Sequence, residues 1–279
     1  MKAKPINAKP INAGPLNRLL TILALRVRTN RWVERLCGRS PGLPTIFDVC
    51  IKVNPFGNLA EAHAMQFVAE HTSIPVPKVP CAFVWKGRAD IAMSRIDGQM
   101  AASGWKLRSE ESRVMILAQL RQMILELRSV PPPPNTGVGN VVGGPFWDCR
   151  LSSDLSGGPY ATIRDFHEAL VNNVMQVEDY TGLPAGVPEL FDFYKQSKHE
   201  LVLTHGDLSS LNILVKGDKV VGIIDWETAG WFPSYWEYTC AKNVNFYNMF
   251  WADEVDRFLT PKPYELKMEE IRNRYFGAY

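Results

Sequence analysis

The chain has 279 residues, a formal net charge of +2 and 46% hydrophobic residues, which suits one large or two small globular domains. Its 31 basic residues are scattered rather than striped, which argues against nucleic-acid binding, and no apolar run approaches the ~20 residues that a membrane span needs. The five cysteines are widely separated and include no C-x-x-C pair, so we expect neither a disulfide framework nor a zinc site, but a soluble cytoplasmic protein with no obligate protein partner.

The first 25 residues are predicted to form a disordered or loosely packed tail. They contain the direct repeat KPINAKPINA, whose Pro, Asn and Ala residues offer little to a packed core. Residues 16–27 can form a helix with Leu16, Leu19, Leu20 and Leu23 along one face, and we expect this helix to pack against the first domain. The segment up to Val33 is basic and has no acidic residue, so a mitochondrial presequence is the alternative.

Residues 45–96 are predicted to form several strands and one helix. Residues 45–53, TIFDVCIKV, predict a strand that carries Lys52 near its end. Residues 60–70 predict a helix whose first turn holds Glu61, where the helix dipole favours an acid. A Lys-Gly-Arg turn then separates the two strands of a predicted hairpin, 81–85 and 91–96.

Three helices are predicted beyond this hairpin, at 109–128, 162–180 and 191–198. The first has glutamates in its opening turn and stops before four consecutive prolines, which cannot continue a helix. Residues 135–159 are rich in Gly and Pro and predict an irregular loop. We expect His167, in the second helix, to have a structural role.

Short strands surround the stretch 203–227, LTHGDLSSLNILVKGDKVVGIIDWE. Residues 201–204 predict a strand that leads into a loop. Two short runs rich in Ile and Val then predict a hairpin, 212–215 and 220–224.

Three polar residues of this stretch, Asp207, Asn212 and Asp225, lie at the ends or junctions of the predicted strands. A rigid backbone at such positions can aim their side chains at one point. Carboxylate and amide oxygens are the ligands that Mg²⁺ prefers. We therefore expect Asn212 and Asp225 to hold a metal ion, which leaves Asp207 free to face a nucleophile.

The order H-x-D-x-x-x-x-N, a hairpin and I-D-x-E is typical of kinase-like phosphotransferases. The stretch HGDLSSLNILV with the later IDWE resembles the aminoglycoside phosphotransferase and choline kinase superfamily, and the continuation TAGWFPSYWEY resembles its large fungal branch. The resemblance covers residues 45–279. It implies an α+β, two-lobed protein-kinase-like fold, with a small N-lobe of antiparallel sheet plus helix at 26–96 and a larger, mainly helical C-lobe at 97–279.

The resemblance also implies an activity, which is transfer of the ATP γ-phosphate to a hydroxyl of a small molecule with Mg²⁺. Asp207 is then the expected catalytic base, and His205 is expected to order the catalytic loop. Glu227 is expected to support the metal or the acceptor. Loss of a general base is worth about 100 to 10,000-fold in rate, so these roles can be tested.

The same resemblance predicts the nucleotide site. Lys52 is expected to neutralise the α and β phosphates and to pair with Glu61, with Glu70 as the alternative partner. The adenine is expected to lie at the end of the second hairpin strand, against Met93, the Ser94 carbonyl and the Ile96 NH. Residues 38–44 hold Gly and Pro without a G-x-G-x-x-G pattern, so a plain turn is indicated more than a phosphate-binding loop.

Two other functions compete with a small-molecule kinase. The missing glycine pattern favours a catalytically silent, nucleotide-binding kinase-like scaffold. A protein kinase needs a long activation segment, and only residues 226–232 separate the metal-binding Asp225 from the segment PSYWE. Gly206 also stands where protein kinases carry an arginine.

The sequence does not select the acceptor among choline-like, sugar and secondary-metabolite hydroxyls. Residues 232–251 are dense in aromatic side chains, which can form a cage for a cation or pack the helices of the C-lobe. Asp253, Glu254 and Asp256 would favour a basic acceptor, but a solvated helix face explains them equally well.

Overall fold

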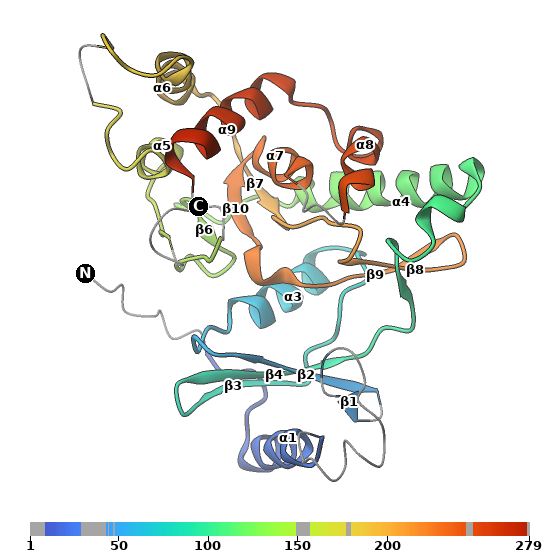
Figure 1. The fold of residues 1–279 in the computed structure, drawn as a ribbon. Helices are drawn as coiled ribbons and strands as arrows, with labels where there is room; N and C mark the ends of the chain where they lie inside the picture. Colours follow the sequence, from blue (N-terminus) through green and yellow to red (C-terminus); the bar gives the residue numbers. More distant parts are fainter. Residues whose placement is uncertain are drawn as a thin grey trace.

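The structure, a computed structural model, describes residues 9–28, 43, 45–46, 48–148, 157–176, 180–243 and 248–277. The chain folds into two lobes (Figure 1); the described residues place a sheet with α1 and α3 in the N-terminal lobe and most of the helices in the C-terminal lobe. The extended residues after β4 connect the lobes. The predicted mixture of α and β elements in two unequal parts is therefore present.

The N-terminal lobe is built on an antiparallel sheet in the order β1-β2-β4-β3, with bounds β1 Thr45–Ile46, β2 Val49–Asn54, β3 Cys81–Trp85 and β4 Arg88–Ser94. The single strand predicted at 45–53 is thus two strands, because the chain turns at Asp48 and pairs Thr45 with Cys50. Aspartate favours such turns. On β4, Met93 lies opposite Cys50 and Ile91 lies opposite Lys52. Since side chains alternate along a strand, Lys52 and Met93 share one face of the sheet.

Each face of this sheet is covered by a helix. α3 (Ala60–His71) covers one face, where its Met65 and Val68 belong to the same buried cluster as Ile91 and Met93 of β4. It begins where Asn58 Oδ1 accepts a hydrogen bond of 2.8 Å from the Ala60 NH. α1 (Pro15–Arg28) packs against β3 on the opposite face, below the sheet in Figure 1.

The expected N-terminal tail is ordered from residue 9 to residue 25. Ile11 is buried and pairs with Ala82 of β3 through backbone hydrogen bonds of 2.8 and 3.0 Å. β3 is an edge strand, so its free backbone groups offer partners to this segment. Residues 9–25 of the predicted tail thus contact this lobe through Ile11 and one side of α1. α1 packs on the lobe as expected, but through Ile22, Thr21 and Leu25, whereas its predicted apolar face is exposed, at Leu16, Leu19, Leu20 and Leu23.

The C-terminal lobe contains the helices α4 Glu110–Ser129, α5 Ile163–Leu170, α6 Val187–Gln196, α7 Trp236–Lys242, α8 Met249–Phe258 and α9 Pro263–Phe276. Ser109 caps α4, because its side chain accepts a 3.2 Å hydrogen bond from the Ser112 NH. The helix predicted at 162–180 ends at Leu170, since Asn172 and Asn173 adopt left-handed backbone angles, with φ of 55° and 60°. α6 begins four residues before the predicted start.

Two small sheets lie beneath these helices and carry the loops of the site. One has the order β5-β8-β9, with β5 Gln99–Met100, β8 Ile213–Lys216 and β9 Lys219–Ile223. The other has the order β6-β10-β7, with β6 Gly139–Asn140, β7 Leu201–Thr204 and β10 Gly230–Pro233. The predicted strand 201–204 is confirmed, but it pairs with β10 rather than with the hairpin. The loop that follows β7 therefore bridges the two sheets.

Among the described residues, none of the helices has both the length and the apolar content needed to cross a bilayer.

Candidate active site

The loop between β7 and β8 is ordered by a buried histidine. His205 Nδ1 accepts a 3.1 Å hydrogen bond from the Asp207 NH, so its Nε2 carries the proton and donates to the Ile224 carbonyl at 3.0 Å. The ring also packs edge-on against Trp226, with 4.5 Å between ring centroids. The structure therefore places His205 behind the loop, where it orients Asp207 rather than facing solvent.

Glu237 of α7 holds the backbone of the same loop. Its carboxylate accepts hydrogen bonds from the His205 NH at 2.6 Å and from the Gly206 NH at 3.0 Å. The side chain is buried, and burial of a carboxylate is compensated by such charge-assisted bonds. Sequence reasoning missed this residue. Its only signal was a lone acid within the aromatic run Trp236-Glu237-Tyr238.

Gly206 is required by the path of the loop. Its φ of +85° lies in the left-handed region, and an added Cβ would lie 3.0 Å from the Thr228 carbonyl oxygen. The Thr228 hydroxyl also donates to the His205 carbonyl at 2.9 Å. The loop and the segment after β9 are thus in close contact, so a side chain at position 206 would require the Thr228 segment to shift.

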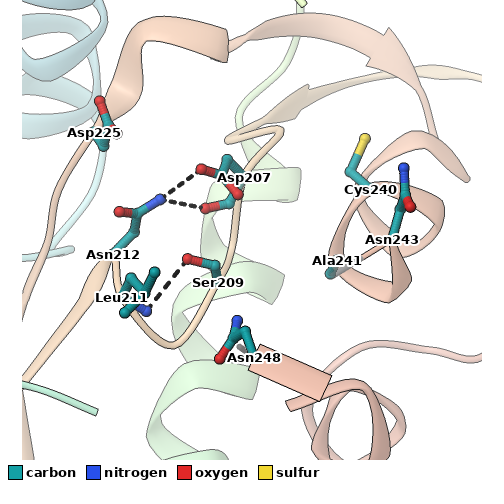
Figure 2. A pocket seen from close by; sticks show the side chains of 9 residues that line it. All are labelled: Asp207, Ser209, Leu211, Asn212, Asp225, Cys240, Ala241, Asn243 and Asn248. Carbon is teal, nitrogen blue, oxygen red and sulfur yellow. Dashed lines mark hydrogen bonds between the residues drawn. The ribbon is translucent and has the colours of Figure 1, made fainter. Parts of the chain in front are cut away.

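Asp207 and Asn212 lie next to each other at the surface of the loop. Asn212 Nδ2 donates to the Asp207 carboxylate at 2.7 Å and to the Asp207 carbonyl at 3.0 Å. Figure 2 shows the amide oxygen of Asn212 turned away from Asp207, on the side of Asp225. One side chain can therefore position the aspartate and still offer an oxygen toward Asp225.

Asp225 follows β9 in an uncommon backbone conformation. Its φ is +65° and its ψ is 59°, a left-handed geometry that costs free energy for a residue other than glycine. The backbone next to it is fixed, because the Ile224 NH donates to the Asn212 carbonyl at 2.9 Å. Non-glycine residues in this region cluster at functional sites, where surrounding structure holds them in place.

Lys52 joins the N-terminal lobe to this site. Its Nζ lies 2.9 Å from Glu61, 2.6 Å from Asp225 and 3.1 Å from Glu227. The predicted pair of Lys52 with Glu61 is therefore formed, and the alternative partner Glu70 is exposed at the far end of α3.

Burial and the neighbouring charges shift the pKa values of Lys52 and Glu61 in opposite directions. Burial alone would lower the pKa of Lys52, but the neighbouring carboxylates of Glu61 and Asp225 outweigh it and raise that pKa above its usual value. Burial raises the pKa of Glu61 to about 7, against the lowering effect of Lys52. The cluster is thus a strongly coupled ionic site at the junction of the lobes.

The residues of this cluster fit a hard divalent cation. Carboxylate oxygens of Glu61, Asp225 and Glu227 lie within 4.8 Å of one another, and the Asn212 amide oxygen faces the same side in Figure 2. Mg²⁺ takes oxygen ligands of this kind. In the structure, the single positive charge of Lys52 lies among these three carboxylates and offsets part of their negative charge.

The residues predicted to contact adenine lie where the lobes meet. Met93 is buried on the same face of the sheet as Lys52. Ser94 ends β4, and its NH donates to the Lys78 carbonyl at 2.8 Å. Ile96 follows in extended backbone beside Gly222 of β9, where an added Cβ would lie 2.5 Å from the Ile96 side chain. The predicted loop at 38–44 lies outside the described residues, apart from Leu43.

A cavity of about 280 Å³ lies beside the loop between β7 and β8, and both Asp207 and Asp225 line it. Figure 2 shows the loop on one side of this space and the end of α7 on the other. The cavity is lined by Asp207, Ser209, Leu211, Asn212, Asp225, Cys240, Ala241, Asn243 and Asn248.

The aromatic residues expected as a cage or as packing serve as packing. Five of them are almost fully buried in the C-lobe cores, namely Phe232, Tyr235, Trp236, Tyr238 and Trp251. Phe250 packs at the edge of a core, and Phe246 and Tyr247 lie outside the described residues. None of the described aromatic residues lines the cavity.

The structure thus combines two lobes, a lysine–glutamate pair in the small lobe, and an aspartate loop in the large lobe with Asn212 and Asp225 beside it (Figure 2). Residues 55–261 match the phosphotransferase enzyme family, and the chain belongs to it. An aminoglycoside 3'-phosphotransferase of Enterococcus faecalis is 27% identical in an alignment of 183 positions that covers 61% of this chain. One of Staphylococcus aureus is 29% identical in an alignment of 168 positions that covers 56% of this chain. The matches span 60% and 54% of the length of these relatives.

Solved structures show the same fold. A thermostable mutant of aminoglycoside phosphotransferase APH(4)-Ia, in a ternary complex with ADP and hygromycin B, superimposes with a TM-score of 0.57. It is 16% identical, and the match covers 88% of each chain. The predicted α+β, two-lobed kinase-like fold is therefore confirmed.

Proposed function

We propose that this protein transfers the γ-phosphate of ATP to a hydroxyl of a small molecule. The observation that carries the proposal is the placement of Asp207 at an open cavity, with Asn212 at 2.7 Å on one side and the cluster of Lys52, Glu61 and Asp225 beyond it. The similarity to two aminoglycoside 3'-phosphotransferases supports this class of reaction.

In this reaction Asp207 accepts or orients the proton of the attacking hydroxyl. The hydrogen bond from Asn212 and the backbone bond to His205 fix the direction of the carboxylate. Because the transition state of phosphoryl transfer is loose, positioning of the nucleophile and neutralisation of charge supply most of the catalysis. His205 and Glu237 act indirectly, by holding the loop that carries Asp207.

Lys52 would bind the α and β phosphates, and Glu61 would hold its ammonium group in place. Asn212 and Asp225 would hold Mg²⁺, with Glu227 as a further carboxylate nearby. Bound Mg²⁺ neutralises phosphate charge. We place the nucleotide in the lobe up to residue 96, against Met93, Ser94 and Ile96, and the acceptor in the lobe from residue 97 onward.

A small acceptor suits this site better than a protein. The residues after Asp225 form a short 3-10 turn, Trp226–Thr228, and then β10, which lies between β6 and β7 in the small sheet. The segment that would serve a protein kinase as an activation loop is thus built into the core. The free thiols at Cys50, Cys81 and Cys240 agree with a reducing, cytoplasmic location.

The test is ATP consumption by the purified protein with Mg²⁺, with and without hydroxylated small molecules. Acceptor-dependent turnover that is lost in Asp207→Asn and in Asp225→Ala would support the proposal. Thermal stabilisation by MgATP with no turnover in any condition would instead support a silent nucleotide-binding scaffold. Phosphate incorporation into added proteins would favour a protein kinase.

A further inference from the structure

We infer that the acceptor is an uncharged, hydroxyl-rich molecule about the size of one sugar ring, rather than a polyamine, and that Asn248 is a specificity-determining residue for it. This inference rests on the proposed function, because it assigns the acceptor that occupies the cavity beside Asp207. It is carried by the charge, the hydrogen-bonding groups and the size of that cavity.

The described lining of the cavity offers few counter-charges to a cation. Asp207 and Asp225 are its only acids among the described residues, and Asp225 already lies 2.6 Å from Lys52. The other lining residues are uncharged: Ser209, Leu211, Asn212, Cys240, Ala241, Asn243 and Asn248. Beyond a contact with Asp207, an acceptor with several ammonium groups would therefore lose its hydration without gaining further ion pairs.

The acids that follow the cavity in sequence are engaged elsewhere. Glu254 accepts from the Trp105 indole at 2.9 Å and from Arg257 at 2.8 Å. Asp256 lies 2.9 Å from Lys242 and accepts from the Tyr238 hydroxyl. Asp253 is exposed and does not line the cavity. The acidic residues that would have favoured a basic acceptor therefore do not serve it.

Asn248 presents a fixed amide to the cavity. Ser210 of the catalytic loop donates its hydroxyl hydrogen to Asn248 Oδ1, and both side chains are buried. This bond sets the orientation of the amide, so its NH₂ group is directed away from Ser210. Figure 2 shows this nitrogen on the side that faces the space between Ser209 and Asn243. An NH₂ donor suits an acceptor hydroxyl or ring oxygen and repels an ammonium group.

The size of the cavity points the same way. Its volume of about 280 Å³ is at the lower end of the range of ~300 to 1,000 Å³ that small-molecule pockets occupy. One ring with its hydroxyls fills such a space, and the further rings of a larger acceptor would lie outside it.

The experiment compares two acceptor panels of matched size with the full-length protein, MgATP and varied salt. One panel contains neutral monosaccharides and cyclitols, and the other contains the corresponding amino sugars, aminocyclitols and whole aminoglycosides. We expect turnover with the neutral panel, and a KM for the acceptor that changes less than about twofold up to ~0.5 M salt, because no ion pair is screened. Lower KM values for the amino compounds, rising steeply with salt, would overturn the inference.

Asn248→Asp tests the residue directly. The new carboxylate still accepts the Ser210 hydroxyl hydrogen but replaces the NH₂ donor with a negative charge. We expect the KM for single-amine acceptors to fall about tenfold at low salt, the equivalent of one new ion pair or hydrogen bond, with kcat changed less. Asn173→Asp is the matched control, because this exposed residue follows α5, outside the cavity lining, and adds the same charge. Equal behaviour of the two variants would overturn the role of Asn248.

The outcomes also separate this inference from the proposed function. Turnover with amino compounds alone would refute the neutral acceptor and leave the kinase activity established. If neither panel stimulates turnover, the acceptor inference fails. Background ATP hydrolysis that is equal in the native protein and in Asp207→Asn would then refute the proposed function as well.

Discussion

At the scale of single residues, the catalytic loop depends on a carboxylate that comes from another element. Glu237 binds two consecutive backbone NH groups, those of His205 and Gly206, with one oxygen each. A buried NH group that loses its acceptor leaves a desolvation penalty of about 1 to 3 kcal/mol. Glu237 therefore couples the position of α7 to the direction of Asp207.

We predict that Glu237→Gln lowers both stability and turnover. One of its terminal atoms becomes an NH₂ donor that faces a backbone NH, so one of the two hydrogen bonds is lost. The free energy of unfolding should fall by about 1 to 3 kcal/mol, and kcat should fall with the acceptor KM changed less. Chemical denaturation and steady-state kinetics measure the two effects. Glu189→Gln is the control, because Glu189 forms an exposed pair with Lys267 at 2.7 Å; equal effects of the two changes would contradict the assignment.

Residues of the site differ in how far they could be predicted from the sequence. Asp207 and Asn212 are five residues apart on one loop, so their contact follows from local spacing. The pairing of Lys52 with Glu61 and its proximity to Asp225 followed only from a resemblance, because 173 residues separate Lys52 from Asp225. Glu237 contacts the loop from α7, and Asn248 contacts it from the N-terminus of α8. Neither contact could be predicted from a local sequence pattern.

At the scale of elements, the turn after β7 sets the geometry of the site. Gly206 has φ of +85° and lies against the Thr228 backbone, whereas Gly217, in the hairpin turn, has φ of +60° with open space around it. Both positions disfavour a side chain through their backbone angles, but only Gly206 has a neighbour that must move. Comparing substitutions at the two glycines therefore distinguishes the cost of backbone strain alone from the added cost of a steric clash.

We predict that Gly206→Ala is the more damaging of the two substitutions. Gly217→Ala should cost about 1 to 2 kcal/mol of unfolding free energy, from its left-handed backbone alone. Gly206→Ala should cost more than this and should also reduce kcat, because the displaced loop carries Asp207. Urea denaturation with activity assays on both variants gives the comparison. A Gly206→Ala protein as stable and active as Gly217→Ala would show that the loop tolerates displacement.

Elements were predicted best where their signals are local. The strands at 81–85 and 201–204 have the predicted bounds, and both are short runs of apolar residues. The helix expected at 162–180 is shorter because two asparagines take left-handed angles, which the apolar spacing does not show. The orientation of α1 was also missed, because its leucines other than Leu25 are exposed and its buried side includes Thr21. Tertiary packing, rather than the periodicity of apolar residues, determines where such a helix ends and which side of it is buried.

At the scale of the whole molecule, a second core lies under the helices of the C-terminal lobe and contains a buried histidine. His167 is fully buried, donates to the Tyr194 carbonyl at 3.4 Å and accepts from the Tyr235 hydroxyl at 2.8 Å. Burial lowers its pKa to about 3. The structure thus supports the expected structural role of His167, outside the candidate site.

We predict that His167 makes the fold acid-sensitive. A histidine whose pKa is lower in the folded state stabilises the protein fully above its unfolded pKa of ~6.5, and this stabilisation is lost as the pH falls toward 3. Between pH 7 and pH 5 the loss should be on the order of 2 kcal/mol. His167→Gln should remove this part of the pH dependence, as measured by denaturation at both pH values. His71→Gln, at an exposed position, is the control; an unchanged pH dependence in His167→Gln would contradict the prediction.

The two lobes together bring the site residues to one place, and the central claim is that Asp207 acts there on a hydroxyl. The measurement that tests it most directly is acceptor-dependent ADP formation by the native protein and by Asp207→Asn. Asparagine keeps the shape of the side chain and can still accept the hydrogen bond from Asn212, so folding should be unchanged. We predict that kcat falls about 100 to 10,000-fold while the KM for MgATP changes little. Undiminished acceptor-dependent turnover in Asp207→Asn would contradict the account.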